Sequence, residues 1–239
     1  MVELLDGFST ICVRNKLTFM LYGGSLLGSY RHFGFIPWDD DIDVLMNGTD
    51  KDRLKHLLNN HEYEIESPDN RQWKFYKKNN NKMCPQPQQN LSDTDVVSGN
   101  FVLNCDKSKV KWPYIDIFMF EENDTHVWDS TPMYHSTYIY QKQDVFPLTL
   151  SPFEESLLPI PRCPNKVLSK TYNIDLCVTP TYSHIYENIP QGRQLSVPCK
   201  RLHKYFPFVF ETNSNGFVHK RLLLNAKVLY EVKQKTLSC

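Results

Sequence analysis

A run of aspartates in residues 38–46, WDDDIDVLM, has the spacing of a metal site. If this run is a β-strand, its side chains alternate between two faces, so Asp39, Asp41 and Asp43 point one way and the mostly apolar residues between them point the other. Three carboxylates about 6.5 Å apart repel one another unless a cation lies between them. Because hard oxygen ligands suit Mg²⁺ or Mn²⁺, the run predicts a divalent-cation site.

A glycine-serine turn lies just before this run. Residues 19–22, FMLY, have the composition of a short apolar strand, Gly23 and Gly24 form a sharp turn, and Ser25 is positioned to cap the helix that follows. The start of a helix offers backbone N–H groups and a positive dipole end, which favour a phosphate. Gly24 and Ser25 are therefore predicted to bind a phosphate group.

The order of the glycine-serine turn and the aspartate run along the chain supports a functional site more strongly than either feature alone. An acidic run alone is more often a solvated loop, and a glycine-serine turn alone says even less. Here one short helix separates them, so that a phosphate site and a metal site belong to the same strand, turn, helix and strand unit. This combination indicates metal-dependent phosphoryl transfer.

A second strand must complete the site. Residues 114–120, YIDIFMF, are β-branched and aromatic apart from one acid, Asp116. A buried strand rarely holds a lone carboxylate, so Asp116 needs a cation or a proton-accepting role. The alternative is an edge strand whose aspartate points outward into solvent.

The run YGGSLLGSYRHFGFIPWDDDIDVLM, residues 22–46, resembles the signature of the LicD family, which includes fukutin and fukutin-related protein. This family belongs to the nucleotidyltransferase superfamily, which also contains DNA polymerase beta. The superfamily pattern is a Gly-Ser turn followed by two carboxylates that flank an apolar residue, matched here at residues 24–25 and 41–43. The resemblance extends over about residues 1–175.

The resemblance implies an α+β fold of the nucleotidyltransferase type, with a mixed central β-sheet flanked by helices. Residues 1–189 are expected to form the catalytic domain, and residues 190–239 a β-rich extension packed on it. A similar aspartate in an apolar strand of LicD-like proteins makes Asp116 the third acid. The expected site is listed by role: catalytic Asp41, Asp43 and Asp116; metal ligands Asp39, Asp41, Asp43 and Asp116 for Mg²⁺ or Mn²⁺; donor phosphate binding by Gly24, Ser25 and Arg31.

The sequence is consistent with two roles for Arg31. Its guanidinium could pair with a donor phosphate through two hydrogen bonds, or it could form a salt bridge to the aspartate run in residues 39–43. Lys74 and Lys77 are interpreted as surface charges.

LicD-type proteins move phosphocholine from CDP-choline to glycans, and the fukutin branch moves ribitol phosphate from CDP-ribitol. By resemblance, the chain is expected to be a metal-dependent phosphotransferase that uses a CDP-alcohol donor and a glycan or glycoprotein acceptor. One alternative is a nucleotidyltransferase whose acceptor attacks the nucleotide phosphorus. Another is an inactive relative that binds glycan or metal.

Composition narrows the class of protein. With 239 residues, of which 41% are hydrophobic, the chain can bury one sizeable core. The formal net charge is zero and no dense basic block occurs, so a nucleic-acid partner is not expected. No apolar run approaches about 18 residues, and the N-terminus is acidic, unlike a signal peptide.

These features predict a soluble chain, with membrane association only if an N-terminal anchor is missing from it. Since fukutin-like relatives carry such an anchor, the resemblance implies the secretory pathway, in the Golgi lumen or membrane, with the cytoplasm as the alternative. The seven cysteines include no Cys-x-x-Cys pair, which speaks against structural zinc. In a lumenal chain, disulfides could form among Cys84, Cys105, Cys163, Cys177 and Cys199.

The remaining patterns predict supporting elements. Apolar spacing predicts helices at residues 2–14 and 52–60, and a third helix that begins near Pro164 and carries Tyr172 inward. Alternating polarity predicts a hairpin of residues 63–66 and 72–77, and strands are expected at 101–103 and in the C-terminal region. Residues 79–99 are predicted to form a polar loop.

Overall fold

The structure is a computed structural model that describes residues 1–69, 71–78, 112–190, 194–236 and 238–239. The loop predicted at residues 79–99 and the strand predicted at 101–103 lie outside the described residues. The same holds for Cys84 and Cys105.

Seven strands of the described residues form the main sheet, in the order β1–β2–β5–β4–β3, with β6 beside β5 and β7 beside β6. Only the β2–β5 pair is parallel among these described strands, so the sheet is mixed, as expected. The predicted hairpin is confirmed as β3 and β4. The strands are β1 (Phe19–Leu21), β2 (Asp43–Asn47), β3 (Tyr63–Glu66), β4 (Trp73–Lys77), β5 (Ile115–Glu122), β6 (His126–Asp129) and β7 (Ile139–Gln141).

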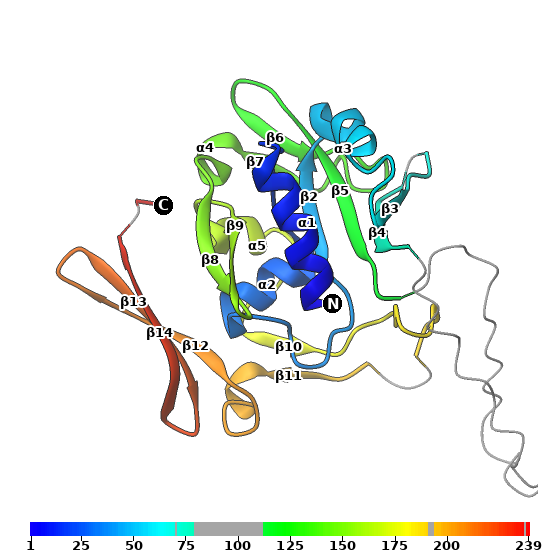
Figure 1. Cartoon of the computed structure of the whole chain (residues 1–239). Coiled ribbons are helices and arrows are strands. Elements are labelled where there is room, and N and C mark those ends of the chain that lie inside the picture. The colour runs from blue at the N-terminus through cyan, green and yellow to red at the C-terminus, as the bar shows by residue number, and fades with distance from the viewer. Residues whose placement is uncertain (70, 79–111, 191–193, 237) are drawn as a thin grey trace, which may run out of the picture.

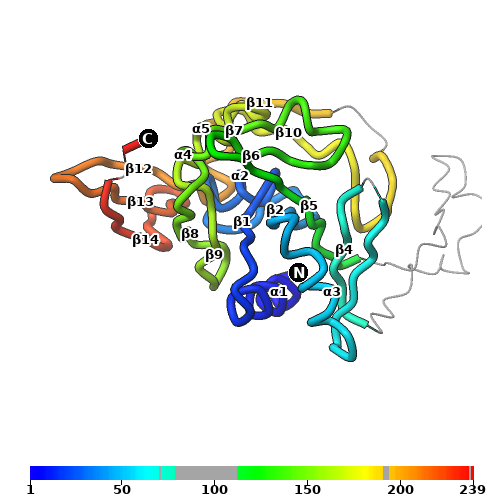
Figure 2. Tube along the Cα trace, turned by 90° about the horizontal axis from the view of Figure 1, so that it is seen from above, coloured from blue at the N-terminus to red at the C-terminus, as the bar shows by residue number. Residues whose placement is uncertain are grey.

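Helices lie on both sides of this sheet. Figure 2 shows α1 (Val2–Arg14) and α3 (Lys51–Leu57) on one side and α2 (Gly23–His32) on the other. The predicted apolar stripe of α1 is confirmed, since Phe8 is fully buried and its ring packs edge-on against Phe19 and Phe75, each at 5.2 Å between centroids. No helix in the described part of the chain combines the length and the apolar character that crossing a membrane requires.

The second half of the chain is rich in β-structure, as expected for its C-terminal end. Figure 1 shows the β12–β14 sheet projecting to one side of the main body. The pair β10–β11 joins residues on both sides of the domain boundary expected at 189/190, which stays a prediction. The remaining elements are η1 (Gly48–Asp50), α4 (Lys142–Val145), β8 (Thr149–Phe153), β9 (Ser156–Ile160), α5 (Pro164–Leu168), β10 (Leu176–Val178), β11 (Ser196–Pro198), η3 (Cys199–Arg201), β12 (Phe208–Ser214), β13 (Phe217–Leu224) and β14 (Lys227–Lys235).

Two local predictions around the aspartate run were wrong. The strand does not begin at Trp38, because the N–H of Asp39 donates to the carbonyl of Ile36 at 2.9 Å and turns the chain, so that β2 begins only at Asp43. Ser25 does not cap α2, which begins at Gly23 with Tyr22 at its N-cap. The Ser25 hydroxyl instead accepts the backbone N–H of Asp43 at 2.9 Å and joins the helix to β2.

Predictions for the later part of the chain also needed correction. The predicted helix begins at Pro164 as expected but ends already at Leu168. Tyr172, which was expected to point inward from this helix, lies beyond its end and is 36% exposed. Two disulfides are present among the described cysteines, Cys177–Cys199 and Cys163–Cys239. The second pairs Cys163 with a residue that had not been considered, because the sequence does not reveal that the C-terminus returns to the region of α5.

A close backbone contact fixes the loop that carries the aspartates. A Cβ atom added to Gly28 in α2 would lie 2.3 Å from the carbonyl oxygen of Gly34 and 3.2 Å from the nitrogen of Ile36. Neither neighbour is a side chain that can rotate away. The absence of a side chain at Gly28 therefore allows the loop after α2 to lie directly on the helix.

We expect Gly28→Ala to destabilise the protein by about 1–3 kcal/mol, because overpacking against the backbone outweighs the gain of about 1 kcal/mol that alanine brings to a helix. Urea unfolding of the two proteins measures this difference. A variant as stable as the parent would show that the loop is free to move away from α2.

His32 joins α2 to the C-terminal sheet. Its Nδ1 donates to the carbonyl of Pro207 at 2.7 Å, and its ring lies 4.5 Å from that of Phe208. Burial, followed by the positive charges of Arg31 and His203, lowers the pKa of His32 to about 4, although the bond to Pro207 opposes the shift. His32 is therefore neutral in the folded protein at neutral pH.

This burial predicts a loss of stability in acid. Because the pKa of His32 is lower in the folded than in the unfolded chain, its neutral form contributes stability that is complete above pH 6.5 and is lost as the pH falls toward about 4. The whole contribution is roughly 3 kcal/mol. We expect the difference in free energy of unfolding between the parent and His32→Asn, whose amide does not titrate, to shrink by about that amount between pH 7.5 and pH 4. A constant difference would contradict this.

Candidate active site

The register of three neighbouring strands brings the first site residues together. In the parallel pair β2–β5, Asp43 lies opposite Asp116. In the antiparallel pair β4–β5, Asp116 lies opposite Lys74. The three side chains therefore form a row across the sheet, and Asp116 is not the outward-pointing residue of an edge strand.

Asp41 joins this row from the loop before β2. The N–H of Asp116 donates to the carbonyl of Ile42 at 2.8 Å, which holds the end of the loop against β5. The carboxylate of Asp41 also lies within 4.8 Å of that of its neighbour Asp40. One carboxylate oxygen from each of Asp41, Asp43 and Asp116 lies within 4.8 Å of the other two. We call these three residues the acid cluster.

Asp39 lies beside the acid cluster but is not one of the three. It lines the same cavity as Asp41 and Asp43, and its Oδ2 would be 2.9 Å from a Cβ atom on Gly24. Its role as a fourth metal ligand stays a prediction.

The N-terminus of α2 points at the acid cluster. The N–H of Gly24 donates to Asp43 Oδ2 at 3.3 Å, so the positive end of the helix lies next to these carboxylates. Gly23 has a positive φ of 50°, and a Cβ atom there would lie 2.6 Å from Asp43 Oδ2. Glycine at this position thus allows the helix to approach the acids closely.

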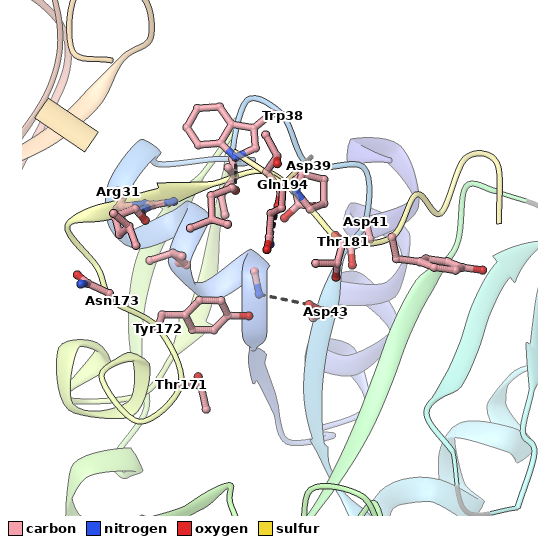
Figure 3. A pocket seen from close by; sticks show the side chains of 18 of the residues that line it. Arg31, Trp38, Asp39, Asp41, Asp43, Thr171, Tyr172, Asn173, Thr181 and Gln194 are labelled. Carbon is pink, nitrogen blue, oxygen red and sulfur yellow. Dashed lines mark hydrogen bonds between the residues drawn. The ribbon is translucent and has the colours of Figure 1, made fainter. Parts of the chain in front are cut away.

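A cavity of about 430 Å³ opens beside the acids. Figure 3 shows the side chains of Asp39, Asp41 and Asp43 on one side of it and Arg31 on the other, with Tyr172 pointing toward Asp43. This volume lies within the range of small-molecule sites. The cavity is therefore large enough for part or all of a small anionic substrate.

Arg31 lines the cavity on the side opposite Asp41 and Asp43 (Figure 3). It is 6% exposed, and its Nη1 donates to the carbonyl of Leu176 at 3.1 Å and to Cys199 Sγ at 3.2 Å. Among the ion pairs of the described residues, none joins Arg31 to the aspartate run. Burial lowers the pKa of Arg31 only to about 10, so its positive charge remains at neutral pH.

The acids repel one another in the absence of a cation. Burial, followed by repulsion from Asp41 and a hydrogen bond to it, raises the pKa of Asp39 to about 7. Burial and then the charge of Asp116 raise the pKa of Asp41 to about 6, against a hydrogen bond from Asp39 that lowers it. Burial and then the charge of Asp41 raise the pKa of Asp43 well above its ordinary value. A cation bound between these carboxylates would offset both the cost of burying their charges and their mutual repulsion.

Two further residues complete the site, and sequence reasoning missed both. Lys74 is not a free surface charge, because its Nζ lies 3.3 Å from Asp116 Oδ1. Its alternation with the buried Trp73 and Phe75 could have indicated that it shares a face with Asp116. His184 reaches the acid cluster from the segment after β10, and no motif or spacing pointed to it.

The acid cluster fits a divalent cation. Its donor set consists of carboxylate oxygens, which Mg²⁺ and Mn²⁺ prefer, and the three groups already lie close enough to share one ion. Burial and then mutual repulsion raise the pKa values of Asp41 and Asp43, and a bound cation would oppose both.

Comparison with known proteins gives consistent matches. A family model described as LicD/FKTN/FKRP, nucleotidyltransferase domain, matches residues 16–163. The lipopolysaccharide cholinephosphotransferase LicD of Haemophilus influenzae is 50% identical over 53 residues, which make up 22% of this chain and 20% of that protein. An uncharacterised protein of Rickettsia prowazekii is 32% identical over 56 residues, or 23% of this chain and 21% of that protein. The chain thus spans about a fifth of the length of these relatives.

Proposed function

The chain belongs to the LicD family, as the match over residues 16–163 shows, and from this premise we propose that it is a metal-dependent phosphotransferase. It moves a phospho-alcohol, of the phosphocholine or ribitol phosphate type, from a CDP-activated donor to a glycan hydroxyl. The observation that carries the proposal is the acid cluster, which faces the N-terminus of α2 beside an open cavity.

We propose that Asp41, Asp43 and Asp116 hold Mg²⁺ or Mn²⁺, which neutralises negative charge on the donor phosphates and on the leaving oxygen when it is bound. Gly24 and Ser25 place the start of α2 toward the same phosphates, where its dipole favours negative charge. Arg31 supplies a permanent positive charge across the cavity, so the donor diphosphate lies between two electropositive features.

In the proposed reaction, the oxygen of an acceptor hydroxyl attacks the distal phosphorus of the donor. The bond from that phosphorus to the bridging oxygen breaks, and CMP leaves. The hydroxyl proton passes to a carboxylate, a role that we assign to Asp116. Asp116 is 2% exposed and lies in the acid cluster beside Asp41 and Asp43, next to the place where the reacting phosphate would bind.

The substrate classes come from the family. The Haemophilus influenzae relative is a cholinephosphotransferase by name, which supports transfer of a phospho-alcohol, and the CDP-activated donor is our proposal from the family resemblance. For the fold, we propose that the mixed sheet and α2 form a nucleotidyltransferase core, as the description of the matching family model suggests. The two disulfides support an oxidising compartment, and we propose the secretory pathway on this ground.

Product analysis tests the proposal. Purified protein is incubated with Mg²⁺ or Mn²⁺, CDP-choline or CDP-ribitol, and a glycan acceptor, and we expect release of CMP. Pyrophosphate release from a nucleoside triphosphate, without CMP from any CDP-alcohol, would instead support nucleotidyl transfer. Absence of both products from a folded protein that binds metal or glycan would support an inactive binding relative.

A further inference from the structure

His184 directs its imidazole ring at the acid cluster. Its Nε2 lies 3.5 Å from Asp41 Oδ2 and 3.8 Å from Asp116 Oδ2. Its other ring nitrogen, Nδ1, lies 3.2 Å from Asp40 Oδ1. The ring therefore lies between Asp40 at one nitrogen and Asp41 and Asp116 at the other, and ligand atoms of Asp40, Asp41 and His184 lie within 4.8 Å of one another.

Asp40 holds this ring in place. Besides the contact with Nδ1, it accepts the Ser183 hydroxyl at 2.8 Å and the backbone N–H groups of His184 and Ile185, each at 3.1 Å. Both of its oxygens are thereby used, which leaves Asp40 as a positioning residue. With the Nδ1 proton donated to Asp40, the lone pair of Nε2 points at the acid cluster.

Further hydrogen bonds, on the side of the segment away from Asp40, also hold the residues around His184 in place. The carboxylate of Glu187 accepts the hydroxyl of Tyr182 at 3.0 Å and the hydroxyl of Tyr114. The backbones of Ser183 and Asn188 form a β-bridge across the turn. His184 thus belongs to a braced turn, and its direction is set before any ion binds.

We propose that Nε2 of His184 is a nitrogen ligand of the cation held by Asp41, Asp43 and Asp116, and that the centre therefore prefers Mn²⁺ to Mg²⁺. Around a six-coordinate ion with bonds of about 2.1 Å, neighbouring ligand atoms lie about 3 Å apart and opposite ones about 4 Å apart. The separations of Nε2 from Asp41 and Asp116 lie between these limits. An imidazole ligand raises affinity for transition metals, whereas Mg²⁺ favours oxygen ligands.

The inference rests on the metal site of the proposed function. The competing explanation is that His184 is a positively charged partner of the acids. These two roles make opposite predictions. A ligand strengthens Mn²⁺ binding, so its removal weakens binding, whereas a cationic partner competes with Mn²⁺, so its removal strengthens binding.

Electron spin echo envelope modulation of the Mn²⁺-loaded protein tests the ligand directly. We expect modulation from a bound imidazole nitrogen in the parent, its loss in His184→Gln, and its retention in His126→Gln, a control at the half-buried first residue of β6. Mn²⁺ affinity should fall about tenfold or more in His184→Gln, and Mg²⁺ affinity should fall less. Asp40→Asn should keep the nitrogen signal but weaken Mn²⁺ binding by about 10- to 100-fold.

Selective ¹⁵N-histidine labelling of the parent decides the question even if His184→Gln does not fold, because the nitrogen signal must change with the isotope. Absence of nitrogen modulation in the parent, or Mn²⁺ binding in His184→Gln that equals or exceeds that of the parent, would overturn the inference. Neither readout needs a donor or turnover. A chain that releases CMP but lacks the nitrogen signal retains the proposed function, and a chain with the signal but no CMP release retains the inference.

Discussion

Replacing Asp41 and Asp43 together by asparagine should abolish both turnover and the stabilisation of the protein by divalent cations. Bound to the folded chain, a cation stabilises the parent by RT ln(1 + [M]/Kd), about 2.7 kcal/mol at a hundredfold excess over Kd. The double variant lacks two of the three carboxylates of the acid cluster and should gain nothing. Paired thermal unfolding in EDTA and in millimolar Mg²⁺ or Mn²⁺ measures this difference.

Without a cation, the double variant should be at least as stable as the parent. A carboxyl whose pKa is higher in the folded than in the unfolded chain contributes stability below its unfolded pKa of about 4, and this contribution is lost as the pH rises. For Asp41 the loss is complete above a pH of about 6. In EDTA, the parent should therefore lose more stability than the double variant between pH 4.5 and 7.5.

Three results would contradict this account. They are a parent protein whose melting temperature does not change with either ion, a double variant that still releases CMP from the donor, and a metal-free double variant that is much less stable than the parent. The first would indicate a solvated acidic loop in place of a metal site.

The second large effect is expected for Asp116→Asn. Asp116 occupies the centre of the row that also contains Asp43 and Lys74, and it is 2% exposed. The amide keeps the shape but removes a proton acceptor and one carboxylate of the acid cluster. It also leaves the Lys74 ammonium facing the site without its partner. We expect turnover to fall on the order of 10²-fold or more, with weaker cation binding.

Asp50→Asn is the matched control. Asp50 is also a buried aspartate, but it lies at the other end of β2, where it accepts the N–H of Thr18 at 2.9 Å and pairs with Arg53 at 2.6 Å. Its replacement should lower stability and leave turnover per folded molecule unchanged. CMP release by equal amounts of folded protein compares the two variants, and full activity of Asp116→Asn would exclude Asp116 from the site.

The sequence by itself predicted the parts of this protein that depend on local pattern. A helical stripe in residues 2–14 and a hairpin of residues 63–66 with 72–77 have periodicities of two to four residues. The strand around Asp116 was predicted from its β-branched and aromatic content. The alternation of residues 39–43 placed Asp41 and Asp43 together, and their carboxylates do lie within 4.8 Å of each other, although β2 begins only at Asp43. Such patterns can be recognised in a single sequence because they depend only on local backbone geometry and on burial of one face of the element.

The tertiary structure decided everything that joins distant segments. Strand register, which no periodicity specifies, placed Asp116 opposite Asp43 and Lys74. The position of His184 at the acids follows from hydrogen bonds to Asp40 that span about 144 residues. The contacts of Arg31 with the segment at β10 have the same origin. These pairings depend on how whole elements pack against one another, and a single sequence contains no local signal for that packing.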